Sequence, residues 1–116
     1  MSNRFDKMKK HVIDGYDCFI SEMEMPTICT YYCGYVVVPT GRNPKLNILN
    51  SNSIACHGGI TYDEVIHDLG RVIGFDCAHG GDIPPFGKWK DKAYVLTQLR
   101  YIVRQLKEME VVKNEY

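Results

Sequence analysis

Apolar residues recur every three or four positions near the start of the chain, and this spacing predicts an amphipathic helix from Phe5 to Met23. Gly15 falls inside the pattern without interrupting it. Met25-Pro26 is expected to end the helix, because a residue that precedes proline disfavours the helical conformation. The apolar face would be formed by Phe5, Met8, Val12, Tyr16, Phe19, Ile20 and Met23.

Two later segments have the composition and alternation of strands. Thr30 to Val38 is rich in tyrosine and valine, and Pro39-Thr40-Gly41 follows it with turn chemistry. From Arg71 to Cys77, Ile73 and the odd positions after it share one face of a strand, and the even positions share the other. Both segments are expected to lie in one sheet.

The chain between these strands gives weaker signals. Asn43 to Asn52 is polar and is expected to be a loop that leads to a further strand near Ser53 to Cys56, which Gly58-Gly59 would break or bulge. The following residues have two interpretations. Ile60 to Tyr62 could continue the strand, or a capping-box spacing at Thr61 could begin a short helix.

The last element has the clearest pattern. Asp91 is a plausible N-cap, and apolar residues then repeat at spacings of four, three, four and three. The preceding segment, His79 to Lys88, contains two glycines and Pro84-Pro85 and is expected to be loop. The stripe of this C-terminal helix consists of Val95, Leu99, Ile102, Leu106 and Met109, widened by Leu96 and Val103.

Together these elements predict an α+β fold in which a small antiparallel sheet is packed by an N-terminal helix and a long C-terminal helix. We expect a single domain over residues 1–116, because the chain is long enough for one modest core. The rhythm of the last helix also permits helix pairing between subunits, so oligomerisation is an additional expectation.

The composition excludes several classes. The 14 basic side chains balance the 14 acidic ones, which disfavours a partner held by broad electrostatics, such as a nucleic-acid polymer. No apolar run is long enough to span a bilayer, and the N-terminus lacks the apolar region of a signal peptide. The five cysteines form no recognisable disulfide framework. We therefore expect a cytoplasmic protein with free thiols and no membrane partner.

Most residues with chemical potential lie in three glycine-bearing strings. The string that begins at Cys33-Gly34 is expected to contribute mainly to the core. His57-Gly58-Gly59-Ile60-Thr61 could present backbone amides to a phosphate, although a simple bulge explains the glycines equally well. In the third string, Asp76, His79 and Asp82 surround Gly80-Gly81 at the end of a strand. They could contact a ligand as acid and base or as acceptors for ribose hydroxyls, while Asp76 could instead cap the loop backbone.

Metal and catalytic motifs are largely missing. A zinc site built from the cysteines and histidines is disfavoured, because the chain has no Cys-x-x-Cys pair and Cys29 and Cys33 are poorly spaced. The nucleotide-binding loop motifs, the nucleophile elbow and the His-Glu-x-x-His motif are also absent. No cofactor is expected.

A basic stripe on the C-terminal helix offers an anion site. Arg100, Arg104 and Lys107 are spaced by four and three, away from the apolar stripe. Such a stripe is commonly a solvated face, but arginine pairs also suit a diphosphate. Aromatic side chains that could stack on a base are Phe75, Phe86, Trp89 and Tyr62.

The glycine strings also carry a family resemblance. Tyr32-Cys33-Gly34-Tyr35-Val36 with Pro39-x-Gly41, then His57 to Tyr62, then Ile73-Gly74-Phe75-Asp76-Cys77-Ala78-His79-x-Gly81-Asp82 resemble a family of small phage and prophage proteins. The resemblance covers about Tyr31 to Leu106. Family members often carry Gly-His-Pro where this chain has Gly41-Arg42-Asn43-Pro44, so the role of that histidine is not carried over.

The family is identified as that of the first-described Thoeris anti-defence proteins, which sequester a cyclic ADP-ribose isomer made by host TIR-domain enzymes. The resemblance implies a homo-oligomer that binds a nucleotide signal without cleaving it, with pockets shared between subunits. It also implies that some relatives bind cyclic oligonucleotides. The ligand-binding residues expected on these grounds are His57, Gly58, Gly59, Thr61, Phe75, Asp76, His79, Asp82, Trp89, Arg100 and Arg104.

Two other functions remain open from the sequence. A metal-dependent hydrolase of nucleotides would use His57, Asp76, His79 and Asp82, if these side chains converge. A protein-binding inhibitor of a host defence effector would instead need an exposed apolar or charged face.

Overall fold

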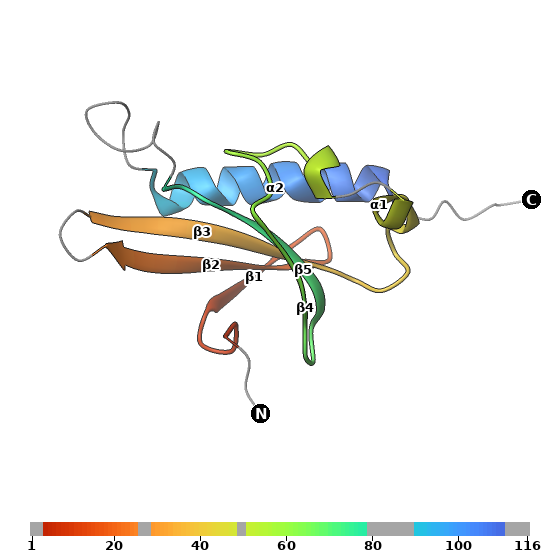
Figure 1. The fold of residues 1–116 in the computed structure, drawn as a ribbon, viewed down its shortest axis with the longest axis horizontal. Coiled ribbons are helices and arrows are strands. Elements are labelled where there is room, and N and C mark those ends of the chain that lie inside the picture. The colour runs from red at the N-terminus through yellow and green to blue at the C-terminus, as the bar shows by residue number, and fades with distance from the viewer. Residues whose placement is uncertain (1–3, 26–28, 49–50, 79–89, 111–116) are drawn as a thin grey trace, which may run out of the picture.

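A five-stranded antiparallel sheet with one long helix on a face forms the framework of the protein (Figure 1). The computed structural model describes residues 4–25, 29–48, 51–78 and 90–110. The strands are β1 (Lys9–Ile13), β2 (Tyr16–Met25), β3 (Cys29–Val38), β4 (Tyr62–Ile66) and β5 (Gly70–Asp76), in the sheet order β1-β2-β3-β5-β4. This confirms the expected α+β fold with a small antiparallel sheet.

The expected N-terminal helix is wrong, because residues 9–25 form a β-hairpin. Asp14 and Gly15 both have positive φ, of 48° and 84°, and they connect Ile13 to its cross-strand partner Tyr16. A two-residue turn with this backbone matches the right-handed twist of a hairpin, and Asp-Gly is one of its preferred sequences. The local Asp-Gly signal therefore prevails over an apolar spacing that resembled a helix.

The apolar residues of the hairpin do not share one face. Tyr16 and Cys18 point into the core beneath the long helix, whereas Phe19 points to the opposite face of the sheet. Phe5 precedes β1 and packs in that second cluster. The apolar residues that follow the three-and-four spacing therefore lie on both faces of a sheet and not on one face of a helix.

Both strands expected in the middle of the chain are confirmed, as β3 and β5. β5 lies between β3 and β4 and is buried on both faces, so Ile73 and Phe75 pack under the helix while Val72 packs on the other side. The alternation expected from Val72 to Cys77 is therefore observed.

The segment between β3 and β4 differs from the expectation. The polar stretch forms a short helix, α1 (Pro44–Ile48), and a 3₁₀ turn at Ser51–Ser53 instead of a loop. No strand forms at residues 53–56, which cross the long helix instead (Figure 1). Neither interpretation of the residues that follow is correct: the expected strand at Ile60 to Tyr62 does not form ahead of Tyr62, and a new strand, β4, occupies the place of the short helix.

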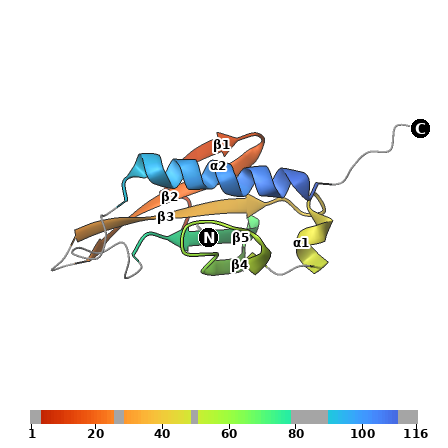
Figure 2. The same cartoon turned by 90° about the horizontal axis from the view of Figure 1, so that it is seen from above.

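The C-terminal helix α2 (Lys92–Glu108) is confirmed together with its cap. The Asp91 carboxylate accepts a hydrogen bond from the Tyr94 amide at 2.8 Å. Its apolar stripe packs on β2 and β3 along one face of the sheet (Figure 2), and the fully buried members are Val95, Leu99, Ile102, Val103 and Leu106. The expected loop at His79 to Lys88 lies outside the described residues. Among the described residues, no helix is both long and apolar enough to cross a membrane.

The opposite face of the sheet is closed by the chain's own N-terminal segment. Phe5 is buried against Phe19 and Tyr35, with ring centroids 5.4 and 5.0 Å away. The guanidinium of Arg4 lies 5.3 Å from the ring centroids of both Tyr35 and Tyr62, and it donates a hydrogen bond to the Tyr35 hydroxyl. Cation–π contacts of this kind stabilise a segment that no helix of the described residues covers.

A buried polar junction ties the hairpin, the β3–α1 connection and the end of α2 together. The Asn43 Nδ2 donates to the Tyr16 hydroxyl at 2.9 Å and to the Leu106 carbonyl at 2.6 Å. The Tyr16 hydroxyl in turn donates to the Glu110 carboxylate at 2.6 Å. Burial raises the pKa of Tyr16, so the hydroxyl stays protonated and able to donate at neutral pH.

We predict that Tyr16→Phe lowers the free energy of unfolding by about 1–2 kcal/mol, because Asn43 loses a buried acceptor while the ring still fills its space. Urea denaturation measures this difference. Tyr101→Phe removes a hydroxyl from an exposed ring and should change stability by less than about 0.5 kcal/mol. Equal effects of the two substitutions would contradict a structural role for the junction.

Candidate functional site

The glycine turn at residues 56–59 is held against one flank of α2 by glutamine side chains. Gln105 bonds to both backbone groups of Ala55, accepting from its amide at 2.8 Å and donating to its carbonyl at 2.7 Å. Gln98 accepts from the His57 amide at 2.8 Å. These glutamine side chains satisfy backbone groups of a segment that belongs to no strand, and so fix it to α2.

His57 faces the first turns of α2. Its Nδ1 lies 2.8 Å from the Tyr94 hydroxyl, and the two rings meet edge to face with centroids 5.3 Å apart. The ammonium of Lys90 lies 5.3 Å from the centroid of the Tyr94 ring. The Tyr94 hydroxyl of α2 therefore orients the His57 imidazole, and the Lys90 ammonium lies near the Tyr94 ring.

The two glycines form a tight turn instead of a bulge in a strand. Gly58 and Gly59 have φ of 68° and 78°, in the left-handed region that glycine favours. The Gly59 amide donates to the Cys56 carbonyl at 3.0 Å, which places Gly58 at the third position of a turn, as in a type II turn. This amide therefore serves the turn rather than a phosphate.

Asp76 caps the end of β5. Its carboxylate accepts hydrogen bonds from the Ala78 amide at 3.0 Å and from the Thr61 hydroxyl at 3.3 Å. These bonds match the interpretation of Asp76 as a cap of the loop backbone. They fix the end of β5, where the third glycine string leaves the sheet. The further members of that string, His79 and Asp82, lie outside the described residues, as does Trp89.

The basic stripe lies on a different flank of α2, beside the turn of the β1–β2 hairpin. A groove of about 520 Å³ runs between them. Arg100 and Arg104 line it, and neither forms an ion pair within the described parts of the chain. The Lys107 ammonium lies 3.5 Å from the Asp14 carboxylate, so it is partly neutralised. The remaining lining residues are Ile13 and Glu108.

A second hollow of about 340 Å³ lies on the exposed side of the same two arginines. Tyr101 lines it with 44% of its surface exposed, next to Thr97 and Gln98. An exposed aromatic ring between two arginines can stack on a planar ligand. We define the arginine face as Arg100, Tyr101 and Arg104 together with these two hollows.

Tyr101 is a candidate that the sequence reasoning missed. It sits off the apolar stripe of α2 and immediately follows Arg100, so its position on the helix predicts exposure. By contrast, Phe75 is 1% exposed and packs under α2, so in this structure its ring has no open face for a base. Tyr62 contributes to the aromatic cluster around Phe5 and is half-buried there.

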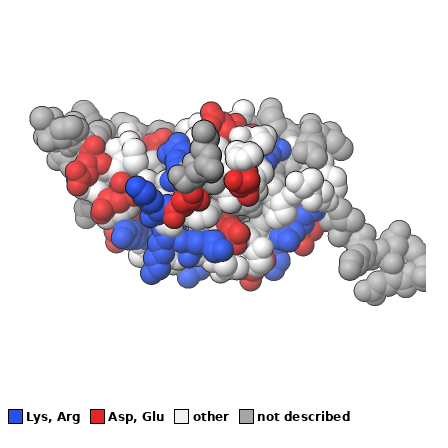
Figure 3. Space-filling model, turned by 90° about the horizontal axis from the view of Figure 1, so that it is seen from below, with Lys and Arg blue, Asp and Glu red and all other residues white. Residues whose placement is uncertain are grey.

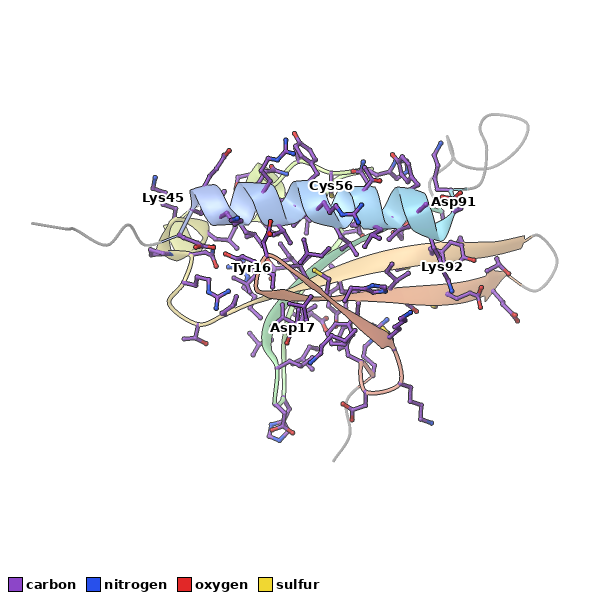
Figure 4. All side chains as sticks on the ribbon, turned by 180° about the vertical axis from the view of Figure 1, so that it is seen from behind. Tyr16, Asp17, Lys45, Cys56, Asp91 and Lys92 are labelled. Carbon is purple, nitrogen blue, oxygen red and sulfur yellow. The ribbon has the colours of Figure 1, made fainter. Side chains whose placement is uncertain are left out.

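The expected ligand-binding residues thus fall into two groups. The glycine turn is bonded to Tyr94 and Gln98 of α2, and Figure 4 shows Cys56, at the start of the turn, beside this helix. The arginines line the groove beside the hairpin turn. Gln98 connects the two groups, because it accepts a hydrogen bond from the His57 amide and also lines the second hollow with Arg100 and Arg104.

The cysteines do not form a reactive or metal-binding centre in the described part of the chain. Burial raises the pKa of Cys18 to about 12 and that of Cys56 to about 11, so both thiols are protonated at neutral pH. The four cysteines whose side chains are described are free, as expected. No group of three or more His, Cys, Asp or Glu side chains among the described residues could hold a metal ion.

Comparison of the chain with family models, with curated proteins and with solved structures gave no match.

We predict that Gly58→Val destabilises the protein by roughly 1–3 kcal/mol, because a β-branched residue is strained at the positive φ of this turn. Gly58→Asn is the matched control, since asparagine tolerates the left-handed region, and should cost under about 1 kcal/mol. Thermal or urea unfolding of both variants measures the difference. A valine variant as stable as the asparagine variant would show that the turn relaxes to negative φ.

Proposed function

We propose that the protein is an anti-defence protein of phage or prophage origin that binds a small nucleotide signal and sequesters it without cleaving it. The signal is a cyclic ADP-ribose isomer, and cyclic oligonucleotides are a related class of ligand. The arginine face carries this proposal, because two guanidinium groups that form no ion pair with the described residues meet an exposed tyrosine there on a rigid helix.

The chemistry of the arginine face suits such a ligand. A guanidinium forms two parallel hydrogen bonds to phosphate oxygens, and two arginines one helical turn apart can contact adjacent phosphates of a diphosphate. Tyr101 can stack on the adenine, and the carboxylates of Asp14 and Glu108 can accept hydrogen bonds from ribose hydroxyls. The larger groove, at about 520 Å³, has the size of a typical small-molecule site.

The glycine turn adjoins the arginine face within one chain, because Gln98 accepts from the His57 amide and lines the second hollow with both arginines. In the proposal, a neighbouring copy completes the pocket, as the resemblance implies for pockets shared between subunits. The proposed protein is a homo-oligomer in the cytoplasm of the bacterial host. Inhibition would follow from mass action, which requires tight binding and a protein concentration comparable to that of the signal.

A release experiment tests binding against catalysis. The purified protein is incubated with cyclic ADP-ribose isomers, separated from free ligand, and then denatured by heat. We expect the intact ligand to be recovered from the denatured protein by liquid chromatography. Recovery of a cleaved product would favour the hydrolase, and no ligand retention together with capture of a host effector would favour the protein-binding inhibitor.

We predict that Arg100→Ala and Arg104→Ala each raise the dissociation constant of the ligand by roughly tenfold or more, because each removes a charge-assisted hydrogen bond. Tyr101→Ala should weaken binding through lost stacking. Isothermal titration calorimetry measures all three. Lys45→Ala removes the same charge from an exposed residue of α1, outside both hollows (Figure 4), and should bind normally. Unchanged affinity in both arginine variants would remove the arginine face from the site.

A further inference from the structure

The side-chain amide of Gln98 is held in one orientation at the second hollow. Its Oε1 accepts a hydrogen bond from the His57 amide at 2.8 Å, and the side chain also lines the hollow. Because a backbone N–H can only donate, this bond decides which end of the Gln98 amide faces the glycine turn. The Nε2 group forms no hydrogen bond with the described residues. Gln98 therefore offers a donor to a ligand in the second hollow.

Thr97, the neighbour of Gln98 on α2, offers the opposite polarity. Its hydroxyl donates to the Ala93 carbonyl at 3.0 Å, and its side chain is exposed and lines the second hollow. A hydroxyl has a single hydrogen and two acceptor lone pairs, so while this bond lasts Thr97 can only accept from a ligand. The second hollow thus presents a fixed donor and a fixed acceptor on adjacent residues.

Tyr101 adds a flat surface next to this pair. Side chains of a helix lean toward its N-terminus, so the ring of Tyr101 covers the preceding turn, which carries Thr97 and Gln98. All three side chains line the same hollow, and Tyr101 is 44% exposed. A planar base that stacks on this ring would bring a polar edge to the donor and the acceptor.

The charges around the second hollow favour phosphate beside that base. Arg100 and Arg104 line the hollow, and its described lining includes no carboxylate. On the face of the molecule opposite α2, by contrast, basic and acidic side chains lie close together (Figure 3). The groove on the other side of the arginines contains the carboxylates of Asp14 and Glu108. Phosphates are therefore better placed on the side of the arginines that faces Tyr101.

Of the two purines, adenine matches the polar pair with one edge. Its 6-amino group donates and the neighbouring N7 accepts, whereas the same edge of guanine carries two acceptors. We propose that Gln98 and Thr97 recognise the adenine of a nucleoside diphosphate bound at the arginine face, Gln98 Nε2 donating to a ring nitrogen and Thr97 Oγ1 accepting from the amino group. This role rests on the proposed function, because it takes the ligand of the arginine face to be a nucleotide.

A pair of ligands that differ in one group provides the first test. Purine riboside 5′-diphosphate is ADP without the 6-amino group, and isothermal titration calorimetry measures the affinity of both. We expect the wild type to bind ADP at least about fivefold more tightly, the effect of one hydrogen bond. Thr97→Val keeps the shape of the side chain and removes the acceptor, so the preference should fall below about twofold.

Thr40→Val is the matched control for this substitution. It makes the same change at an exposed residue outside both hollows and should keep the preference of the wild type. Three results would each overturn the proposal: no binding of ADP, equal affinity of the wild type for the two diphosphates, or an undiminished preference in Thr97→Val.

Gln98→Glu tests the donor. Glutamate keeps an oxygen for the His57 amide and replaces Nε2 with a second acceptor. Its charge also repels phosphate, and inorganic pyrophosphate, which has no base, measures that repulsion alone. We expect the affinity for ADP to fall at least about fivefold further than the affinity for pyrophosphate. Equal losses for the two ligands would remove Gln98 from base recognition.

The release experiment with cyclic ADP-ribose isomers decides the proposed function separately. A protein that retains the cyclic isomer but does not distinguish ADP from purine riboside 5′-diphosphate would lose only the recognition of adenine by Gln98 and Thr97. A protein that distinguishes the two diphosphates but retains no cyclic isomer would keep that recognition and lose the proposed signal.

Discussion

The close approach of α2 to the sheet at Gly34 is the constraint on which the rest of the structure depends. A Cβ atom at this position would lie 2.7 Å from Phe75 Cε1 and 3.1 Å from Leu99 Cδ2, so a larger residue would push the helix or the ring away. Leu99 can therefore pack against β3 in the middle of the core. Close packing at this depth fixes the height of α2 and the direction of both its flanks.

Two sides of α2 position the candidate ligand-binding residues. On one flank, Gln98 and Gln105 satisfy the backbone of residues 55–57 and so position the glycine turn. On another, Arg100 and Arg104 border the groove beside the hairpin turn, whose position is set by the buried junction at Tyr16. A site built on a packed helix is held more precisely than one built on loops, which suits the tight binding that the proposed function requires.

The face of the sheet opposite α2 is closed differently, and this leaves the sheet edges exposed. Arg4 and Phe5 cover the aromatic cluster without a second helix. A segment this short covers the middle of the face but adds no strand to either side. Within the described sheet, β1 and β4 are therefore the outer strands, each paired on one side only.

Local patterns in the sequence determined β3, β5 and α2, because residue alternation, helical period and the Asp91 cap act within a few residues. The period of α2 also placed Arg100 and Arg104 on the surface. The same spacing misassigned residues 5–23, where the Asp14-Gly15 turn was the deciding local signal. Only the tertiary structure decided the strand order, the burial of Phe75 and the attachment of the glycine turn to α2. These depend on contacts such as Ala55 with Gln105, 50 residues apart, which form only when long-range packing offsets the entropy of closing the chain.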